Sequence, residues 1–212
     1  MKRLSEAFKD LVTGLITVFY PKDCFSNQSS LNSMPIVACS GKRSGKVAKE
    51  TTDKGYCSTK SMYYYGVKLY ALAFRREFTI PFAEEIQITQ ASVNDLTVFK
   101  EVWSFKENRC FFGDKIYQNK DFFSDFEKEK NSVMMTPVKA VKGECQEIRN
   151  RVKASNDLYS TAVSRVRQPI ESFFNWLIQK TDIQRASKVR STKGLLVHLF
   201  GKIASAFINL IF

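Results

Sequence analysis

The sequence has little of what zinc sites and thiol chemistry require. Its 212 residues include one histidine, His198, and five cysteines, at positions 24, 39, 57, 110 and 145. The cysteine count is odd and no two cysteines stand as C-x-x-C, so the spacing of a structural zinc site is absent. This pattern favours an intracellular chain with reduced thiols.

Acidic residues are also in the minority. The chain has 21 Asp and Glu against 33 Lys and Arg, a net charge of +12. A surplus of this size indicates a polyanionic partner, either nucleic acid or an anionic membrane face, and we favour nucleic acid. The alternative is a protein of high pI without such a partner. With 44% hydrophobic residues, the chain can bury the core of one sizeable domain, which excludes a disordered protein.

The first twenty residues, MKRLSEAFKDLVTGLITVFY, resemble a signal peptide only weakly, because Glu6, Lys9 and Asp10 interrupt the apolar stretch and no small-residue cleavage site follows. Their apolar positions instead recur at intervals of three or four. Such spacing predicts an amphipathic helix. The positions are Leu4, Phe8, Leu11, Leu15 and Phe19.

The last nineteen residues, GLLVHLFGKIASAFINLIF, approach the length of a transmembrane helix. Four polar residues recur inside this stretch: His198, Lys202, Ser205 and Asn209. Because polar groups are costly at the centre of a bilayer, we favour a helix packed on the domain over a membrane span. A small basic membrane-associated protein stays open as an alternative.

Between these ends, strand and helix patterns alternate. We expect strands at 25–31, 63–74, 78–89, 109–115 and 131–137, with the second and third forming an antiparallel hairpin. We expect helices at 92–103, with Ser92 as N-cap, at 118–129, and from 165–169 through ESFFNWLIQK. Residues 40–60 are expected to be an exposed basic loop, and 138–160 a loop with some helix. This order predicts an α/β sheet with helices packed on it.

Two acidic residues stand where a sheet protein binds ligands or caps a helix. Asp114 follows Gly113 at the end of a predicted strand in FFGDKIY, and open α/β sheets bind ligands at the carboxyl ends of their strands. An N-cap is the alternative role. Glu171 lies in the first turn of a predicted helix, where the helix dipole alone favours it. Taken singly, neither residue identifies a site.

Taken in order, five stretches resemble a known family: NSMPIVAC, GYCSTKSMYYYGVKL, ITQASVNDL, FFGDKIY and SRVRQPIESFF. They are similar to the motifs of DDE-type transposases of bacterial insertion sequences, which read roughly DSMP, GYCxSKxxxYYGxKLH, TPAxxxD, GDKxY and RxxIExxF. The resemblance runs from about residue 29 to the C-terminus. It implies an RNase H-like mixed sheet with helices packed on both faces. It also implies strand cleavage and transfer on double-stranded DNA, at element ends and target, by a cytoplasmic, nucleoid-associated homodimer.

The resemblance also implies three acidic residues that hold two Mg²⁺ or Mn²⁺ ions. Asp114 matches the second aspartate of the family, Glu171 matches its glutamate, and Arg167 matches the arginine one helical turn earlier. The first aspartate belongs directly before SMP, and that residue is Asn32. Two metal ions would activate the attacking oxygen and stabilise the leaving oxygen of a phosphodiester.

Asn32 is a poor replacement for a bridging carboxylate, because it offers one neutral oxygen and two donor hydrogens. Mg²⁺ prefers hard oxygen ligands, so we expect this chain to bind the metal pair weakly and to cleave poorly or not at all. Asp23, the nearest acid upstream, is an improbable substitute. Tyr70 and Ser164 also depart from the family, which has histidine and tyrosine there. We expect a truncated copy, with residues 1–24 as the helical remnant of a longer region and 25–212 as the DDE domain.

Contacts with DNA phosphates are expected mainly from the basic loop at 40–60. Phosphate contacts position DNA without reading its sequence. The alternative is a solvated, charged loop without a partner, and a DNA-binding remnant without catalysis is a further alternative for the whole chain. The candidate DNA-binding residues are Arg43, Lys46, Lys49, Lys54, Lys60 and Arg167.

Overall fold

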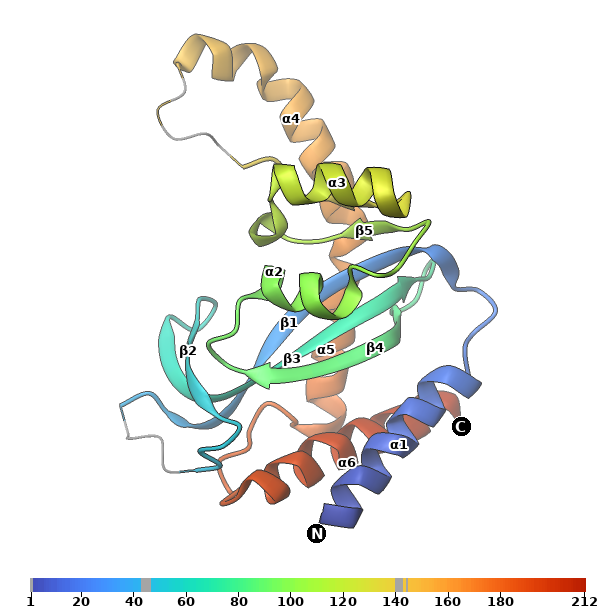
Figure 1. Cartoon of the computed structure of the whole chain (residues 1–212), viewed down its shortest axis with the longest axis vertical. Helices are drawn as coiled ribbons and strands as arrows, with labels where there is room; N and C mark the ends of the chain where they lie inside the picture. Colours follow the sequence, from blue (N-terminus) through green and yellow to red (C-terminus); the bar gives the residue numbers. More distant parts are fainter. Residues whose placement is uncertain (1, 43–46, 140–142, 144) are drawn as a thin grey trace.

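The computed structural model describes residues 2–42, 47–139, 143 and 145–212. Figure 1 shows the elements in chain order. The strands are β1 (Phe25–Ser40), β2 (Asp53–Cys57), β3 (Met62–Arg75), β4 (Phe82–Gln90), β5 (Cys110–Phe112) and β6 (Val133–Met135). The α-helices are α1 (Lys2–Val18), α2 (Asp95–Val98), α3 (Lys120–Lys130), α4 (Gln146–Arg167), α5 (Pro169–Thr181) and α6 (Thr192–Ile211). A π-helical turn, Phe99–Trp103, extends α2, and a 3₁₀ turn, Lys115–Tyr117, precedes α3.

All six strands form one mixed sheet. The order is β2-β3-β1-β5-β6, and β4 pairs with β3 along the same edge as β2. β3 is antiparallel to β1, β2 and β4, whereas β5 is parallel to both β1 and β6. An antiparallel meander continued by two parallel strands, with helices on both faces, is the RNase H-like class that the sequence predicts.

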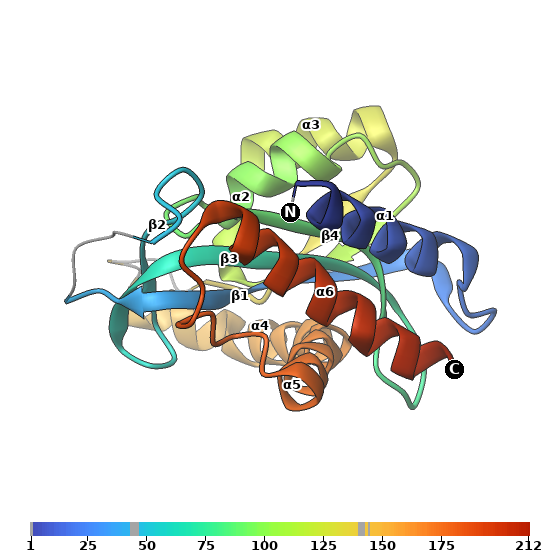
Figure 2. The ribbon, with the colours of Figure 1, turned by 90° about the horizontal axis from the view of Figure 1, so that it is seen from below.

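The sheet divides the core into two layers because side chains alternate between its faces. On one face, Leu31, Tyr70 and Leu72 pack with Val98 of α2 and with aromatic residues of its π turn and of β5. On the other face, Met34 and Ile36 of β1 pack with side chains of α5 and α6. Figure 2, seen from below, shows α2 and α3 on one side of the sheet and α4 and α5 on the other.

The predicted end of the first strand and the predicted loop at 40–60 were wrong. β1 runs from Phe25 to Ser40, well past the predicted end at Leu31, and includes Pro35. Proline lacks a donor N–H and is tolerated where one edge of a strand is unpaired. Among the described residues, β5 pairs with β1 only at Gln28–Ser30, so Pro35 interrupts no ladder with that strand. The predicted 40–60 loop contains β2, whose Gly55 and Cys57 are buried.

Two helix predictions also needed correction. α2 begins at Asp95 rather than after Ser92, since Asn94 Oδ1 accepts the cap bond from Leu96 N, and the Ser92 hydroxyl donates to Asp53 instead. Most of the segment 138–160, predicted as mainly loop, belongs to α4. The first turns of α4 are exposed nearly all round. They therefore lack the apolar stripe from which a helix is recognised in sequence.

The terminal helices α1 and α6 pack against each other, and α6 also packs against α5. α6 is long and apolar enough to cross a membrane, and 33% of its apolar window is buried inside the protein. Phe207 of α6 makes an edge-on contact with Phe82 of the sheet, at 5.7 Å between ring centroids. His198 Nε2 lies 3.3 Å from the Ile183 carbonyl oxygen. These contacts agree with the predicted packed helix with a polar edge.

Candidate active site

The pairing of β1 with β5 brings Asn32 and Asp114 to the same level of the sheet. The two strands are parallel, with Gln28 opposite Cys110 and Ser30 opposite Phe112. Continuing this register by two residues sets Asn32 beside Asp114, whose backbone is still extended at φ −80° and ψ 170°. Neighbouring strands lie about 4.8 Å apart, and opposed residues project to one face. Asn32 and Asp114 therefore share one face at the end of β5.

The junction of α4 and α5 covers this face. Asn32 projects to the same face of β1 as Met34 and Ile36, which lie in the core layer under α5. Ser30 projects to the same face two residues earlier, and its hydroxyl donates to the Val166 carbonyl of α4 at 3.2 Å. The last turn of α4 and the first turn of α5 are thus held over the end of the sheet that carries Asn32.

Glu171 and Arg167 stand at this junction. Pro169 opens α5, where its missing N–H costs nothing, and Glu171 follows in the first turn. The Arg167 Nη2 group donates to Glu171 Oε1 at 2.6 Å. The Arg167 side chain is only 14% exposed, whereas that of Glu171 is 51% exposed. The arginine therefore fixes a carboxylate that stays accessible from solvent.

Asn32 and Asp114 each commit one oxygen to the backbone beside them. Asn32 Oδ1 accepts from Ser33 N at 2.8 Å. Asp114 Oδ1 accepts from Lys115 N at 2.6 Å and so caps the 3₁₀ turn, in agreement with the capping alternative. Because a carboxylate has about four acceptor sites, capping leaves Asp114 able to bind a cation as well.

The residues present do not fit a pair of divalent ions. Within the part of the chain that the structure describes, no three His, Cys, Asp or Glu side chains lie close enough together to hold a metal ion. Position 32 supplies an amide beside the two carboxylates. Asp23 is engaged elsewhere, in an ion pair with Arg76 at 2.9 Å.

A buried network on the opposite face, centred on Asp95, was missed in the sequence, which predicted only Ser92 as the cap of this helix. Asp95 is 8% exposed. Its Oδ1 accepts from Lys68 Nζ at 2.8 Å and from the Tyr70 hydroxyl at 3.2 Å. Its Oδ2 accepts from the hydroxyl of Ser33, the residue next to Asn32, at 2.8 Å. The only signal in the sequence was the position of Asp95 in the block ITQASVNDL.

We expect Asp95→Ala to lower the free energy of unfolding by about 3 kcal/mol, because it leaves the half-buried Lys68 ammonium without its counter-ion. Ser33→Ala is the matched control and should cost about 1 kcal/mol, the value of one hydrogen bond. Urea denaturation followed by circular dichroism measures both. Equal costs for the two variants would contradict this account of the network.

Tyr117 lies next to Asp114 in the fold and is 1% exposed. Its hydroxyl has no hydrogen-bond partner among the described residues, and neither has the Nε atom of Arg167. Burial raises the pKa of Tyr117 well above its ordinary value, and the nearby Asp95 carboxylate raises it further. The phenol is therefore neutral and contributes mainly its ring to the core.

Removing the Tyr117 hydroxyl should not lower the stability of the fold. We expect Tyr117→Phe to leave the free energy of unfolding within about 0.5 kcal/mol of the original, or to raise it, because no hydrogen bond is lost. Tyr70→Phe is the control, since the Tyr70 hydroxyl bonds to Val93 and Asp95, and it should destabilise by about 1 kcal/mol. Thermal unfolding of the two variants side by side distinguishes them.

Of the five loop residues predicted for DNA contact, the structure describes three: Lys49, Lys54 and Lys60. Arg43 and Lys46 lie outside the described residues. Lys49 is exposed. Lys60 Nζ donates to Gln184 Oε1 at 2.6 Å, which ties it to the segment between α5 and α6.

Lys54 lies far from Asn32 along the sheet. Lys54 is paired with Tyr65 of β3, whereas Asn32 is paired with Ala71, six residues farther along the same strand. Six residues of a strand span about 20 Å. Of the predicted site residues, the fold thus sets Asn32 beside Asp114 under the junction that carries Arg167 and Glu171, and it leaves Lys54 at a distance.

The chain thus has a sheet of the RNase H-like class with acidic side chains at the end of β5 and on the helix over it. Residues 33–208 match the family model described as "Transposase DDE domain". This match covers more than half of the chain, so the chain belongs to the transposase DDE domain family. Asn32 lies one residue before the matched range. Neither the search of curated proteins nor that of solved structures gave a match.

Membership of this family gives the general function, DNA transposition. Transposases of the family act on DNA and generally use divalent metal ions. They are normally cytoplasmic.

Proposed function

We propose that this chain is a transposase domain of an insertion sequence whose strand cleavage and strand transfer at element ends are impaired by Asn32. The observation that carries the proposal is the shared face of Asn32 and Asp114 under the junction that holds Glu171. In this arrangement Asp114 and Glu171 are the two carboxylates available for metal ions, and Arg167 orients Glu171 and contacts the DNA backbone.

The impairment follows from charge. Two divalent cations would bring four positive charges together, and a third carboxylate at position 32 would offset one of them. The amide of Asn32 offsets none and offers one oxygen, which the Ser33 backbone already uses. Mg²⁺ gives up its water ligands reluctantly, so the amide competes poorly with water.

The second candidate is a DNA-binding protein without catalysis. The net charge of +12 favours DNA binding whether or not the chain cleaves. Both candidates bind double-stranded DNA. For the transposase, we also propose a homodimer that pairs two element ends.

One experiment separates the two candidates. The unaltered chain and Asn32→Asp are incubated with a duplex of the element's end sequence, first without metal to measure binding and then with Mg²⁺ or Mn²⁺ to measure cleavage. We expect both proteins to bind and Asn32→Asp to cleave much faster. If both proteins bind the duplex and neither cleaves it, the result would refute the transposase proposal and support the DNA-binding protein without catalysis. Fast cleavage by the unaltered chain would refute the impairment.

A further inference from the structure

The first turns of α4 reach out from the molecule. The helix has 22 residues, a length of about 33 Å. Its last turns are held by the body, where Val163 is buried and Val166 accepts the bond from Ser30. Residues 146–158, which we name the α4 arm, are exposed except for a half-buried Asn156. In Figure 1 the arm extends beyond the sheet and its helices.

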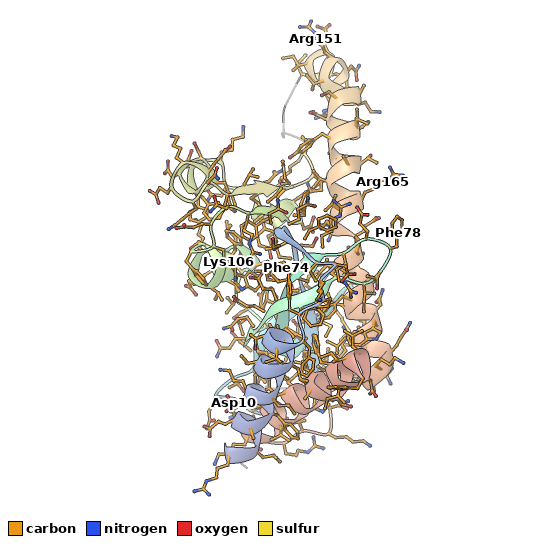
Figure 3. The ribbon with its side chains drawn as sticks, turned by 90° about the vertical axis from the view of Figure 1, so that its right-hand side faces the viewer. Asp10, Phe74, Phe78, Lys106, Arg151 and Arg165 are labelled. Carbon is orange, nitrogen blue, oxygen red and sulfur yellow. The ribbon has the colours of Figure 1, made fainter. Side chains whose placement is uncertain are left out.

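Positive charge predominates along α4. The helix carries five basic residues and two acidic ones. The pair Lys153–Asp157 is 3.4 Å apart and largely exposed on both sides, so it neutralises little in water. Figure 3 shows Arg151 at the tip of the arm and Arg165 farther down the same helix, pointing away from the body.

The basic residues lie on two sides of the helix. Arg151 and Arg165 are fourteen residues apart, which places them about 21 Å apart along the axis and within about 40° around it. Lys153 lies about 160° from Arg151 around the axis. A helix with cations on opposite sides fits the major groove of DNA, which is about 12 Å wide and bounded by phosphates on both sides.

The exposed apolar residues of the arm do not form the seam of a helical dimer. Ile148 and Val152 lie on the side that continues into Tyr159, whose hydroxyl contacts Met135 of the same chain. Leu158, 74% exposed, lies about 80° or more around the axis from both. A coiled coil requires one apolar stripe sustained over several heptads. The arm lacks the apolar stripe of a helical dimer and carries an excess of positive charge. Both features favour DNA over a second copy of the chain as the partner.

The arm is continuous with the candidate active site. α4 ends at Arg167, whose guanidinium bonds to Glu171. If a DNA duplex lay along the arm, its sugar-phosphate backbone would therefore come close to Arg167 and to the accessible Glu171. We propose that the α4 arm binds duplex DNA beside the candidate active site, through Arg151 and Lys153. This inference rests on the proposed function, and it replaces the loop at 40–60 as the main surface for phosphate contact near the carboxylates.

The test is the salt dependence of duplex binding by the full chain, measured without metal by fluorescence anisotropy. The double variant Arg151→Ala/Lys153→Ala should bind on the order of tenfold more weakly at 0.1 M salt. The slope of log Kd against log salt should fall by about 1.8, or 0.9 for each lost phosphate contact. The matched control, Lys9→Ala/Lys180→Ala, removes two exposed lysines of α1 and α5 and should leave the affinity and the slope nearly unchanged.

Each other outcome overturns the inference in a recognisable way. If the unaltered chain binds duplex and both double variants bind equally well, the arm is not the DNA surface, and the proposed function stands. If the unaltered chain does not bind duplex at all, the proposed function fails with it. If sedimentation shows a dimer that Leu158→Glu dissociates while DNA affinity stays constant, the arm binds a second copy instead.

Discussion

Asn32→Asp is expected to cleave end-sequence DNA at least ~100-fold faster than the unaltered chain in the presence of Mg²⁺ or Mn²⁺. Loss of a partner that merely orients a metal ligand typically costs 10–100-fold in affinity or activity, so restoring a ligand itself should gain at least as much. The substitution changes an amide for a carboxylate of nearly the same shape. The carboxylate can still accept the bond from Ser33 N, so the fold should not change.

The controls for this prediction use the same position and its partner. Asn32→Ala should show no gain, because it supplies no oxygen. Asn32→Asp combined with Asp114→Asn should lose the gain, because the two residues lie side by side at the end of β5. Equal rates for Asn32→Asp and the unaltered chain, in the presence of normal DNA binding, would contradict the assignment of position 32.

Gly66→Ala is expected to lower the free energy of unfolding by about 3 kcal/mol or more, or to prevent folding. Gly66 lies in β3, between Val37 of β1 and Asp53 of β2. A Cβ atom there would overlap the carbonyl oxygen of Ile36. Because the obstacle is backbone rather than a flexible side chain, the strands must separate, and overpacking of this kind costs 1–3 kcal/mol or more.

Gly14→Ala is the matched control for this substitution. Gly14 lies in α1, and no atom outside the helix lies within 4 Å of the position that its Cβ would take. Alanine is favoured over glycine in a helix by about 1 kcal/mol, so this variant should be slightly more stable. Chemical denaturation of the two variants measures the difference. A Gly66→Ala midpoint equal to that of the unaltered chain would show that β1 and β3 are less tightly paired than described.

Much of the fold was predictable because its strands have a strong pattern. The alternation of residues 63–74 predicted β3, and the short apolar runs around Phe111 and Met134 predicted two further strands, which the structure shows to be parallel to β1. Pro35 obscured the second half of β1, since a proline usually argues against a strand with two paired edges. The α4 arm has no buried face, so its sequence lacks the period that identifies a packed helix.

The site was predictable only in part, for a related reason. Asp114 and Glu171 were found through short blocks around them, and Asn32 through its place before SMP. Their convergence depends on the β1–β5 register and on the Ser30–Val166 contact, which join residues more than eighty positions apart. The buried role of Asp95 was missed because its partners, Lys68 and Ser33, lie on strands far from it in the sequence.

Direct titration of Mn²⁺ into the unaltered chain and into Asn32→Asp, by calorimetry without DNA, tests the central claim most directly. We expect Asn32→Asp to bind two ions. The unaltered chain should bind at most one, at least ~100-fold more weakly, because Asp114 and Glu171 are the only carboxylates that the described residues supply at the site. Two ions bound with equal affinity by both proteins would contradict the claim that Asn32 stands in the place of a metal-binding aspartate.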